Sequence, residues 1–490
     1  MKTRVNDDRP IPKAQKIIFT SAFDLLRNPI TNDDVIKSET SQSNNNFFQG
    51  KEKKGEGFGE SEHRHHHHNT LLHSQYGEPA IKSLHFPFAL KPDQIKAVEA
   101  WMANGQRGSL IYSSGTGKTE IAFECARQAA DRSGKQHFRI LLILPRIVLI
   151  EQNYRRLVNY GISEEKIGRY FGEQKEIREI TLSTYHSIAN ASSLVRDADM
   201  IIFDEVHLAS STARAFSRIF DIMAKKEEGN KALLGLTATL DEDDPRNFTI
   251  MTALPPVRKY LIKDAVLDGR LAKPVIVPIS VTLTEKEQKT YDACSDKIKR
   301  ISSRFHTHDP QRMMTLLRAG GFPSWQARAW FLNVRKRKTL LASADNKLSK
   351  AAELIAEKQR NKQKVMVFSE TLESVRKLKQ TLKDRGIDSV IIDSGMPSFK
   401  RQRILSQWGT KFYPLLSVHT LEIGYDVPEV DVEIILASTS NMNQVVQRIG
   451  RVIRKFRDKE HAFVYVVYVA DTKDDYMFST FKRAINSAAC

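Results

Sequence analysis

The sequence predicts an α/β protein with two parallel-sheet lobes, a basic helical insertion between them and a largely disordered N-terminal region. From about Leu84, short apolar runs alternate with amphipathic stretches of helical spacing, which is typical of a parallel sheet covered by helices on both faces. The same alternation returns after about residue 345. At 490 residues, the chain is also too long for one ordinary core.

Residues 1–83 differ in composition from the rest of the chain. Thr31–Thr70 is rich in Ser, Asn, Lys, Glu and Gly, so we expect it to be mostly disordered. It contains the histidine tract His65–His68, which is either a solvated low-complexity run or a set of transition-metal ligands. The N-terminus lacks the apolar core of a secretory signal, and no apolar run is long enough to span a bilayer. We therefore expect an intracellular protein, in the cytoplasm or nucleoid.

The first lobe is expected over residues 84–275 and the second over residues 346–490. In the first we predict a helix at Lys118–Ala130 and buried strands at Ser109–Tyr112, Ile140–Leu144, Met200–Phe203 and Leu233–Gly235. In the second we predict helices at Lys347–Arg360 and Thr371–Arg385, and strands at Lys364–Phe368, Val390–Ile392, Leu415–Val418, Val432–Leu436 and Ala462–Val469.

The insertion, residues 276–345, has helical character and many basic residues. Strand signals vanish between Leu283 and Ala342, and Gly320–Pro323 should break the segment into two parts. The whole chain carries a net charge of +18, which favours a polyanionic partner, either nucleic acid or an anionic membrane; a solvated basic surface is the alternative. The three cysteines lie far apart without metal-ligand spacing, so no disulfide framework is expected.

The segment Ser114–Thr119 has the pattern of a phosphate-binding loop between a strand and a helix. Gly115 and Gly117 allow phosphate oxygens to come close to the backbone of the loop. The backbone N–H groups of Ser114, Gly115, Thr116 and Gly117 would then surround these oxygens. Lys118 would reach the β- and γ-phosphates, and the Thr119 hydroxyl would ligate Mg²⁺. Tyr112 stands where the full pattern has glycine.

Two further segments complete a phosphoryl-transfer site. Asp204 and Glu205 follow a buried strand, where Asp204 can hold Mg²⁺ and Glu205 can orient and deprotonate the attacking water. Gln447, Arg451 and Arg454 share one face of a predicted helix, and we expect the two arginines to stabilise the charge on the γ-phosphate from the second lobe.

With these segments in this order, the chain resembles the superfamily 2 DExH helicases, and most closely their XPB branch. The resemblance covers about residues 84–470 and implies two RecA-like lobes with ATP and Mg²⁺ between them. It implies that Gln94 reads adenine, that Gly424 and Asp426 lie on the nucleotide side, and that His207, Thr237 and Thr239 couple hydrolysis to movement. The nucleic-acid contacts that we expect are Arg146, Thr184, Ser369, Thr420, Trp325, Arg335 and Arg337.

Part of the insertion has two possible interpretations, and one motif departs from the family's pattern. Trp325 and Trp330 either stack on bases or form a small helical core, and Arg335–Lys338 is either a nucleic-acid contact or a solvated turn. Where family members have Arg-Glu-Asp after the coupling motif, this chain has Glu242–Asp244, so the arginine is missing.

The resemblance implies an ATP-dependent DNA helicase or duplex-DNA translocase, acting in repair or transcription. The expected partner is nucleic acid, DNA more than RNA, with no membrane partner and a monomer in solution. The alternatives are a DExH RNA helicase, the motor subunit of a restriction-type complex, and a nucleotide-gated binding module that does not hydrolyse ATP.

Overall fold

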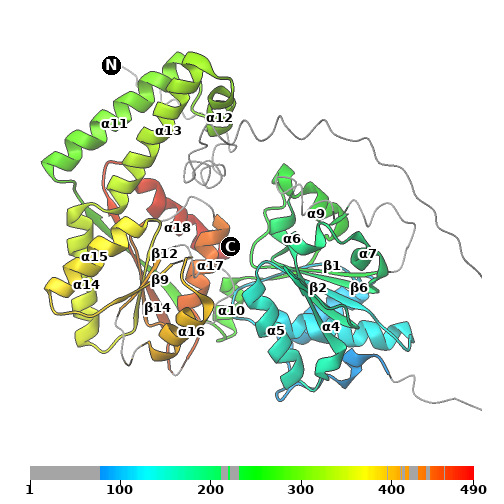
Figure 1. Ribbon diagram of the computed structural model, residues 1–490. Coiled ribbons are helices and arrows are strands. Elements are labelled where there is room, and N and C mark those ends of the chain that lie inside the picture. The colour runs from blue at the N-terminus through cyan, green and yellow to red at the C-terminus, as the bar shows by residue number, and fades with distance from the viewer. Residues whose placement is uncertain are drawn as a thin grey trace, which may run out of the picture.

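The computed structural model describes residues 78–210, 219–220, 231–393, 395–408, 410, 414–418, 429–437, 442–456 and 458–489. It contains two α/β lobes and an arm of helices that projects from the second lobe (Figure 1). The predicted fold class is thereby confirmed for the two lobes. The His65–His68 tract and the rest of residues 1–77 lie outside the described residues.

The first lobe is built on an eight-stranded sheet in the order β4-β3-β5-β2-β6-β7-β1-β8. All strand pairs in it are parallel except β3 with β4. The strands are β1 (Arg107–Tyr112), β2 (Ile140–Leu144), β3 (Ile167–Phe171), β4 (Gln174–Lys175), β5 (Ile180–Thr184), β6 (Met200–Asp204), β7 (Ala232–Thr237) and β8 (Pro256–Tyr260). The helices are α3 (Pro92–Ala103), α4 (Lys118–Ser133), α5 (Ile147–Asn159), α6 (Tyr185–Ile188), α7 (Ser192–Asp197), α9 (Phe248–Ala253) and α10 (Ile262–Leu267). Short 3-10 turns lie at η2 (Ala80–Ser83), η3 (Glu164–Lys166), η4 (Val206–Ala209) and η5 (Pro245–Asn247).

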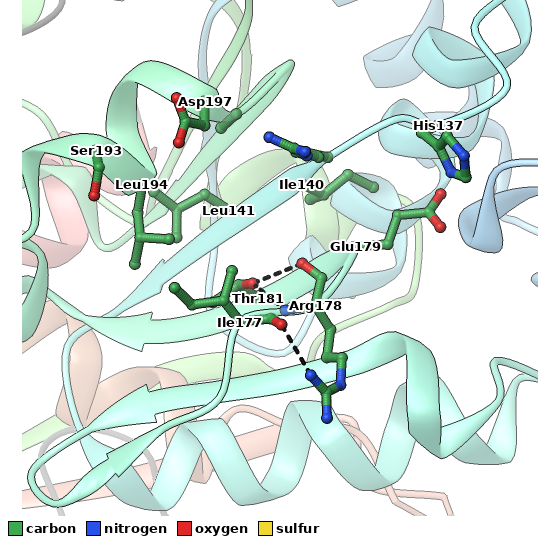
Figure 2. A pocket seen from close by; sticks show the side chains of 12 residues that line it. His137, Ile140, Leu141, Ile177, Arg178, Glu179, Thr181, Ser193, Leu194 and Asp197 are labelled. Atoms are coloured by element: carbon green, nitrogen blue, oxygen red, sulfur yellow. Dashed lines mark hydrogen bonds between the residues drawn. The ribbon is translucent and has the colours of Figure 1, made fainter. Parts of the chain in front are cut away.

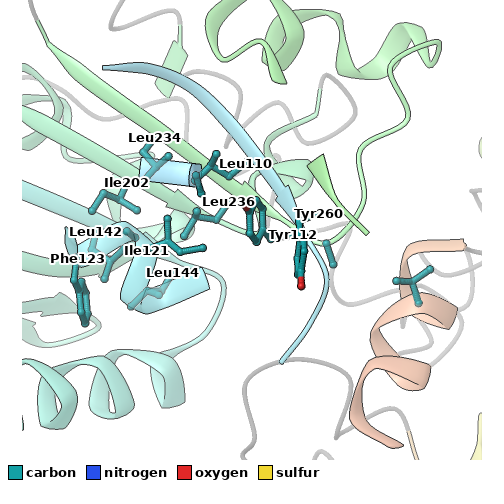
Figure 3. Packing of buried hydrophobic residues seen from close by; sticks show 14 of the residues in the cluster. Leu110, Tyr112, Ile121, Phe123, Leu142, Leu144, Ile202, Leu234, Leu236 and Tyr260 are labelled. Carbon is teal, nitrogen blue, oxygen red and sulfur yellow. The ribbon is translucent and has the colours of Figure 1, made fainter. Parts of the chain in front are cut away.

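The central strands of this sheet are apolar on both faces because helices cover both faces. Alternate side chains enter different cores: Leu142 and Ile202 pack with Ile121 of α4 in one cluster (Figure 3), whereas Leu141 and Ile201 belong to the other. The continuous apolar runs that predicted β1, β2, β6 and β7 have this origin. The peripheral strands β3, β5 and β8 were not predicted, because their shorter apolar runs are mixed with polar residues.

The second lobe has a six-stranded parallel sheet in the order β11-β12-β10-β13-β14-β9. Its strands are β9 (Lys273–Val281), β10 (Val365–Ser369), β11 (Val390–Ile392), β12 (Leu415–Val418), β13 (Val432–Ile435) and β14 (His461–Val469). Its helices are α14 (Asp345–Arg360), α15 (Leu372–Asp384), α16 (Ser398–Gln407), α17 (Met442–Val452) and α18 (Asp475–Ala489).

Strand β9 joins the second sheet although it precedes the helical insertion in the chain. It pairs with β14 along its whole length, from Lys273 to Val281. The boundary expected between residues 275 and 276 therefore falls inside a strand. Pro274 and Pro278 conceal this strand in the sequence, since proline is confined to edge strands, and β9 is at the edge of the sheet.

The arm consists of α11 (Glu285–Arg304), α12 (Pro310–Arg318) and α13 (Gly321–Ala342). The break predicted at Gly320 is present, with φ +74° at that residue, and a second break separates α11 from α12. Trp330 is buried in a small core with Ile298 and Met313, and its Nε1 donates to Ser302 Oγ at 2.9 Å. Trp325 is 76% exposed. The core alternative therefore holds for Trp330 and does not hold for Trp325.

Candidate nucleotide site between the lobes

The loop between β1 and α4 has the backbone of a phosphate-binding turn. Gly115 and Gly117 both have φ +84°, a conformation that favours glycine. A Cβ on Gly117 would collide with Gln94 Nε2, so a larger residue there would strain the backbone and displace Gln94. Lys118 Nζ donates to the Tyr112 carbonyl oxygen at 3.0 Å, and the buried Thr116 hydroxyl donates to Ser113 O at 2.7 Å.

Tyr112 has a structural reason to replace the glycine of the full pattern. Its side chain is fully buried, its hydroxyl donates to Asp93 O at 2.9 Å, and the same oxygen accepts from Arg258 Nε at 3.1 Å. Its ring stacks on Tyr260 with centroids 5.2 Å apart (Figure 3). Burial raises the pKa of Tyr112 to about 12, so the hydroxyl keeps its proton and fixes the end of β1 to α3.

Gln94 lies at the start of α3 and reaches the phosphate loop. Its Oε1 accepts from Lys91 N at 2.8 Å, and its Nε2 donates to the carbonyl oxygens of Thr116 and Gly117 at 3.2 and 3.3 Å. The glutamine is therefore held beside the loop. Its role in reading adenine stays a prediction.

The acidic pair lies at the carboxyl end of β6. Burial, and then the neighbouring charge of Glu205, raises the pKa of Asp204 to about 7, while the charge of Lys118 opposes this rise. Glu205 has φ +52°, an uncommon conformation for a residue with a side chain. The buried Asp204 carboxylate, with the charge of Glu205 beside it, suits a cation. The site therefore fits Mg²⁺, which Asp204 would hold with the Thr119 hydroxyl as second ligand. Among the described residues, no group of three or more His, Cys, Asp or Glu side chains forms a metal site; Mg²⁺ bound through one carboxylate and substrate phosphates needs no such group.

The three residues expected to couple hydrolysis to movement form one connected chain with Glu205. Glu205 Oε2 lies 3.4 Å from His207 Nδ1, which is 3.0 Å from Thr237 Oγ1. Thr237 Oγ1 donates to Thr239 O at 2.8 Å and accepts from Thr239 N at 3.2 Å. Because the Thr237 hydroxyl already donates to Thr239 O, we infer the His207 tautomer whose Nδ1 carries a proton and donates it to Thr237 Oγ1. Burial lowers the pKa of His207, which favours this neutral form.

Helix α17 of the second lobe packs directly on the phosphate loop of the first. A Cβ on Gly450 would lie 2.7 Å from Ser114 Cβ, and Arg454 Cγ lies 3.2 Å from the position of a Cβ on Gly115. Arg451 is 9% exposed. The structure therefore brings the two distant segments together, with Arg454 beside the loop. Helix α17 ends at Val452, however, so the helix face predicted for Gln447, Arg451 and Arg454 does not extend to Arg454, which forms a bridge with Leu271 instead. Gln447 lies on α17, but its side chain is outside the described residues, as are Thr420, Gly424 and Asp426.

Sequence reasoning missed a buried carboxylate beneath these arginines. Glu433, in the middle of β13, is 1% exposed. Burial raises its pKa to about 7 against the opposing charges of Arg448, Arg451 and Lys459. An acidic residue inside an apolar strand run is the signal that could have identified it.

Three of the expected nucleic-acid contacts are accessible. Arg146 is exposed ahead of α5, and Trp325 and Arg335 are exposed on α13 of the arm. The position of α13 beside the second lobe is visible in Figure 1.

The other three described contacts already have partners within the protein. Thr184 is buried and caps α6 by accepting from Ser187 N at 3.3 Å. Ser369 is buried with its Oγ 2.6 Å from Ser374 Oγ. Arg337 donates to Ser295 Oγ at 3.2 Å. Their roles in binding nucleic acid stay predictions, and the contacts shown here are structural.

A cavity of about 500 Å³ lies elsewhere in the first lobe (Figure 2). Its lining includes Ile140, Thr181 and Ala198, which lie at or just before the amino ends of β2, β5 and β6. Asp204 is at the opposite end of β6. Ligands of parallel α/β sheets bind at the carboxyl ends of strands, so this cavity is not part of the nucleotide site.

Comparison with known proteins agrees with this geometry. Residues 87–242 match the family model described as the res subunit of type III restriction enzymes, and residues 346–456 match the helicase conserved C-terminal domain. Over 418 residues the chain is 26% identical to the DNA 3'-5' translocase XPB2 of Sulfurisphaera tokodaii, covering 83% of this chain and 88% of the relative. The chain belongs to the superfamily 2 helicases, in their XPB-like branch.

This XPB-like helicase is also similar to the DNA 3'-5' helicase XPB of Mycobacterium tuberculosis, with 31% identity over 47% of this chain and 42% of the relative. With XPB of Kineococcus radiotolerans it shares 25% identity over 79% of this chain and 61% of the relative. The chain thus spans about half the length of these bacterial relatives. The helicase domain of Pyrococcus furiosus Hef shares the fold, with a TM-score of 0.52 at 18% identity over 81% of this chain and 100% of that one. The helicase domains and the XPB relatives show that the helicase is a nucleic-acid-dependent ATPase. No helix in the described part of the chain is long and apolar enough to cross a membrane.

Proposed function

We propose that this helicase is an ATP-dependent DNA translocase or helicase that moves along DNA as its lobes open and close around Mg²⁺-ATP. The observation that carries the proposal is the packing of α17 and the residues just after it on the phosphate loop, with Gly450 of α17 against Ser114 and Arg454 against Gly115. Groups of both lobes thus surround one site, so binding and release of a triphosphate there can change how the lobes meet.

In the proposed reaction, Lys118 binds the β- and γ-phosphates and Arg454 approaches the γ-phosphate from the second lobe, with Arg451 beside it. Positive charge at these positions stabilises the charge that spreads over the transferring phosphoryl group. Glu205 orients the attacking water and accepts its proton. Bound Mg²⁺, held by Asp204 and Thr119, would neutralise phosphate charge.

The contact of His207 with both Glu205 and Thr237 gives a route from hydrolysis to movement. When the water-binding carboxylate changes its charge, the hydrogen bond from His207 to Thr237 can change with it, and Thr237 fixes the turn at Thr239. Burial keeps His207 neutral, so the ring acts as a donor of fixed orientation.

Basic residues of both lobes support a nucleic-acid track. Arg401 on α16 is buried and donates to the carbonyl oxygens of Asp393 and Met396 at 3.1 and 2.7 Å. Burial, and then the nearby positive charge of Arg146, lowers the pKa of Arg401. Arg146 itself is exposed, so it is the arginine of this pair that a strand phosphate could reach. Trp325 and Arg335 on the arm could extend this track by stacking on bases and neutralising phosphates.

The choice of DNA, and of 3′-to-5′ movement, follows the printed names of the XPB relatives. A role in repair or transcription and a monomeric state stay predictions. The test is the ATPase rate with single-stranded, duplex or forked DNA and with RNA, over a salt series. We expect DNA to stimulate more than RNA, and the logarithm of the apparent DNA affinity to fall linearly with the logarithm of salt concentration.

Stronger stimulation by RNA would contradict the DNA assignment and favour the RNA-helicase alternative. A Glu205→Gln variant with the same turnover as the parent would contradict the hydrolytic mechanism. A strand labelled at either end with a bound protein block tests direction: displacement only from the 5′ end is expected for 3′-to-5′ movement.

A further inference from the structure

One arginine between the lobes contacts both the start of α3, where Gln94 lies, and the phosphate loop. Arg270 follows α10, just before the chain enters β9 of the second lobe. Its Nη1 forms an ion pair with the carboxylate of Asp93, the residue before Gln94, and its Nη2 donates to Thr116 O at 2.8 Å. Asp93 is 6% exposed and Thr116 is fully buried, so this contact is shielded from solvent.

The residues after Arg270 are bonded to the arginine segment of the second lobe. Leu271 and Arg454 form an antiparallel bridge, and Ala272 N donates to Ile453 O at 2.8 Å. Leu271 Cδ2 also lies 3.7 Å from the position of a Cβ on Gly115. One peptide unit therefore separates the side chain that holds Asp93 and Thr116 from the backbone that holds Arg454.

We propose that Arg270 is a positioning residue: it sets the position of Arg454 according to the position of the Asp93–Gln94 segment. This inference rests on the proposed function, because it requires Arg454 to act on the phosphate. The planar guanidinium has two separate nitrogens on two partners, which fixes its orientation and with it the register of Leu271 against Arg454. A shift of the Asp93–Gln94 segment on nucleotide binding would be passed to Arg454 through this short backbone connection.

If Arg270 only stabilised the phosphate loop, the effect of its substitution on kcat would not depend on Arg454. A double-mutant cycle separates the two roles. The measured quantities are the DNA-stimulated kcat and the Kd of ATP for Arg270→Ala, Arg454→Ala and the double variant. We expect Arg270→Ala to lower kcat by roughly tenfold or more, since small misplacement of a catalytic group is costly, and to change the Kd of ATP less than it changes kcat.

In the Arg454→Ala background the same change should lower kcat by less than about twofold, because the group that Arg270 positions is already missing. Arg270→Lys, which keeps a charge for Asp93 but not the two-armed geometry, should give an intermediate kcat. Asp93→Asn should show the same non-additivity with Arg454→Ala. These two milder variants keep the test informative if Arg270→Ala folds poorly.

Lys259→Ala is the matched control. Lys259 forms an ion pair with Glu242, is adjacent to Tyr260 at the end of β8, and should leave kcat unchanged. An equal loss from Arg270→Ala in the parent and Arg454→Ala backgrounds would overturn the inference while leaving the proposed function intact. An unchanged kcat in Arg454→Ala alone would count against the proposed function itself, and with it against this inference.

Discussion

Gly450 provides a direct test of whether α17 meets the phosphate loop in the working enzyme. The added methyl group in Gly450→Ala would lie 2.7 Å from Ser114 Cβ and 3.2 Å from Ser114 Oγ. Carbon atoms in contact prefer about 3.5–4.0 Å, so the helix and the loop would have to separate by about 1 Å. Overpacking of this kind costs about 1–3 kcal/mol, and the cost falls on the closed arrangement of the lobes.

At about 1.4 kcal/mol per tenfold change in rate, this cost corresponds to a loss of about 5- to 150-fold in DNA-stimulated kcat. The free energy of unfolding of the second lobe should not fall, because alanine stabilises a helix relative to glycine by about 0.5–1 kcal/mol. The expected result is a large loss of ATPase activity with an unchanged or higher melting temperature. Steady-state ATPase assays and thermal unfolding measure the two quantities.

Ser114→Gly provides the compensating change. Without the serine side chain, the nearest remaining atom to the new methyl group is the Cα of residue 114 at 3.9 Å, an ordinary contact. The double variant should therefore recover most of the activity of Ser114→Gly alone. Full activity in Gly450→Ala, or no recovery in the double variant, would refute the reasoning that these two surfaces meet during catalysis.

Three further predictions concern single side chains. Lys118→Ala should abolish ATP hydrolysis, because the loop loses its charge for the β- and γ-phosphates; unchanged turnover would refute the assignment of the loop. Burial raises the pKa of the Glu433 carboxyl from 4.5 to about 7. The neutral carboxyl stabilises the folded protein below pH 4.5, and this stability is lost as the pH rises from 4.5 to about 7, because the folded protein then has to hold a buried charge. Glu433→Gln should therefore match the parent in thermal unfolding at pH 4 and exceed it at pH 8, by up to about 3 kcal/mol; equal midpoints at both pH values would contradict this. Trp325→Ala should weaken single-stranded DNA binding by about 1–3 kcal/mol without loss of stability, whereas Trp330→Ala should destabilise the arm by about 3–5 kcal/mol, and binding and melting measurements on the pair distinguish the two roles.

Much of the fold could be predicted because it depends on local pattern. Strands β2, β11 and β12 have the predicted bounds. The bounds of β1, β6, β7, β10, β13 and β14 differ from the prediction by one or two residues at one or both ends. These strands have continuous apolar runs because helices cover both faces of the sheet. Such runs can be recognised directly in the sequence. Strand β9 was missed because its prolines and half-exposed faces give no such run.

Two segments of the site could be predicted from local pattern alone. Ser114–Thr119 and Asp204–Glu205 lie at strand ends, where backbone geometry alone presents their groups. The two tryptophans of the arm had the same composition signal, yet one is buried and one exposed, because helix packing and not residue type decides which face is covered.

The sequence by itself determined the two lobes, the phosphate loop and the acidic pair, since each is set by hydrogen bonding and hydrophobic periodicity over a few residues. Only the tertiary structure decided that Gly450 and Arg454 meet the loop, and that Arg270 reaches Asp93, 177 residues away in the chain. Contacts at such separations depend on how complete lobes pack and how the chain crosses between them. No short stretch of sequence contains that information, because the free energy that fixes these contacts is shared among residues that become neighbours only after folding.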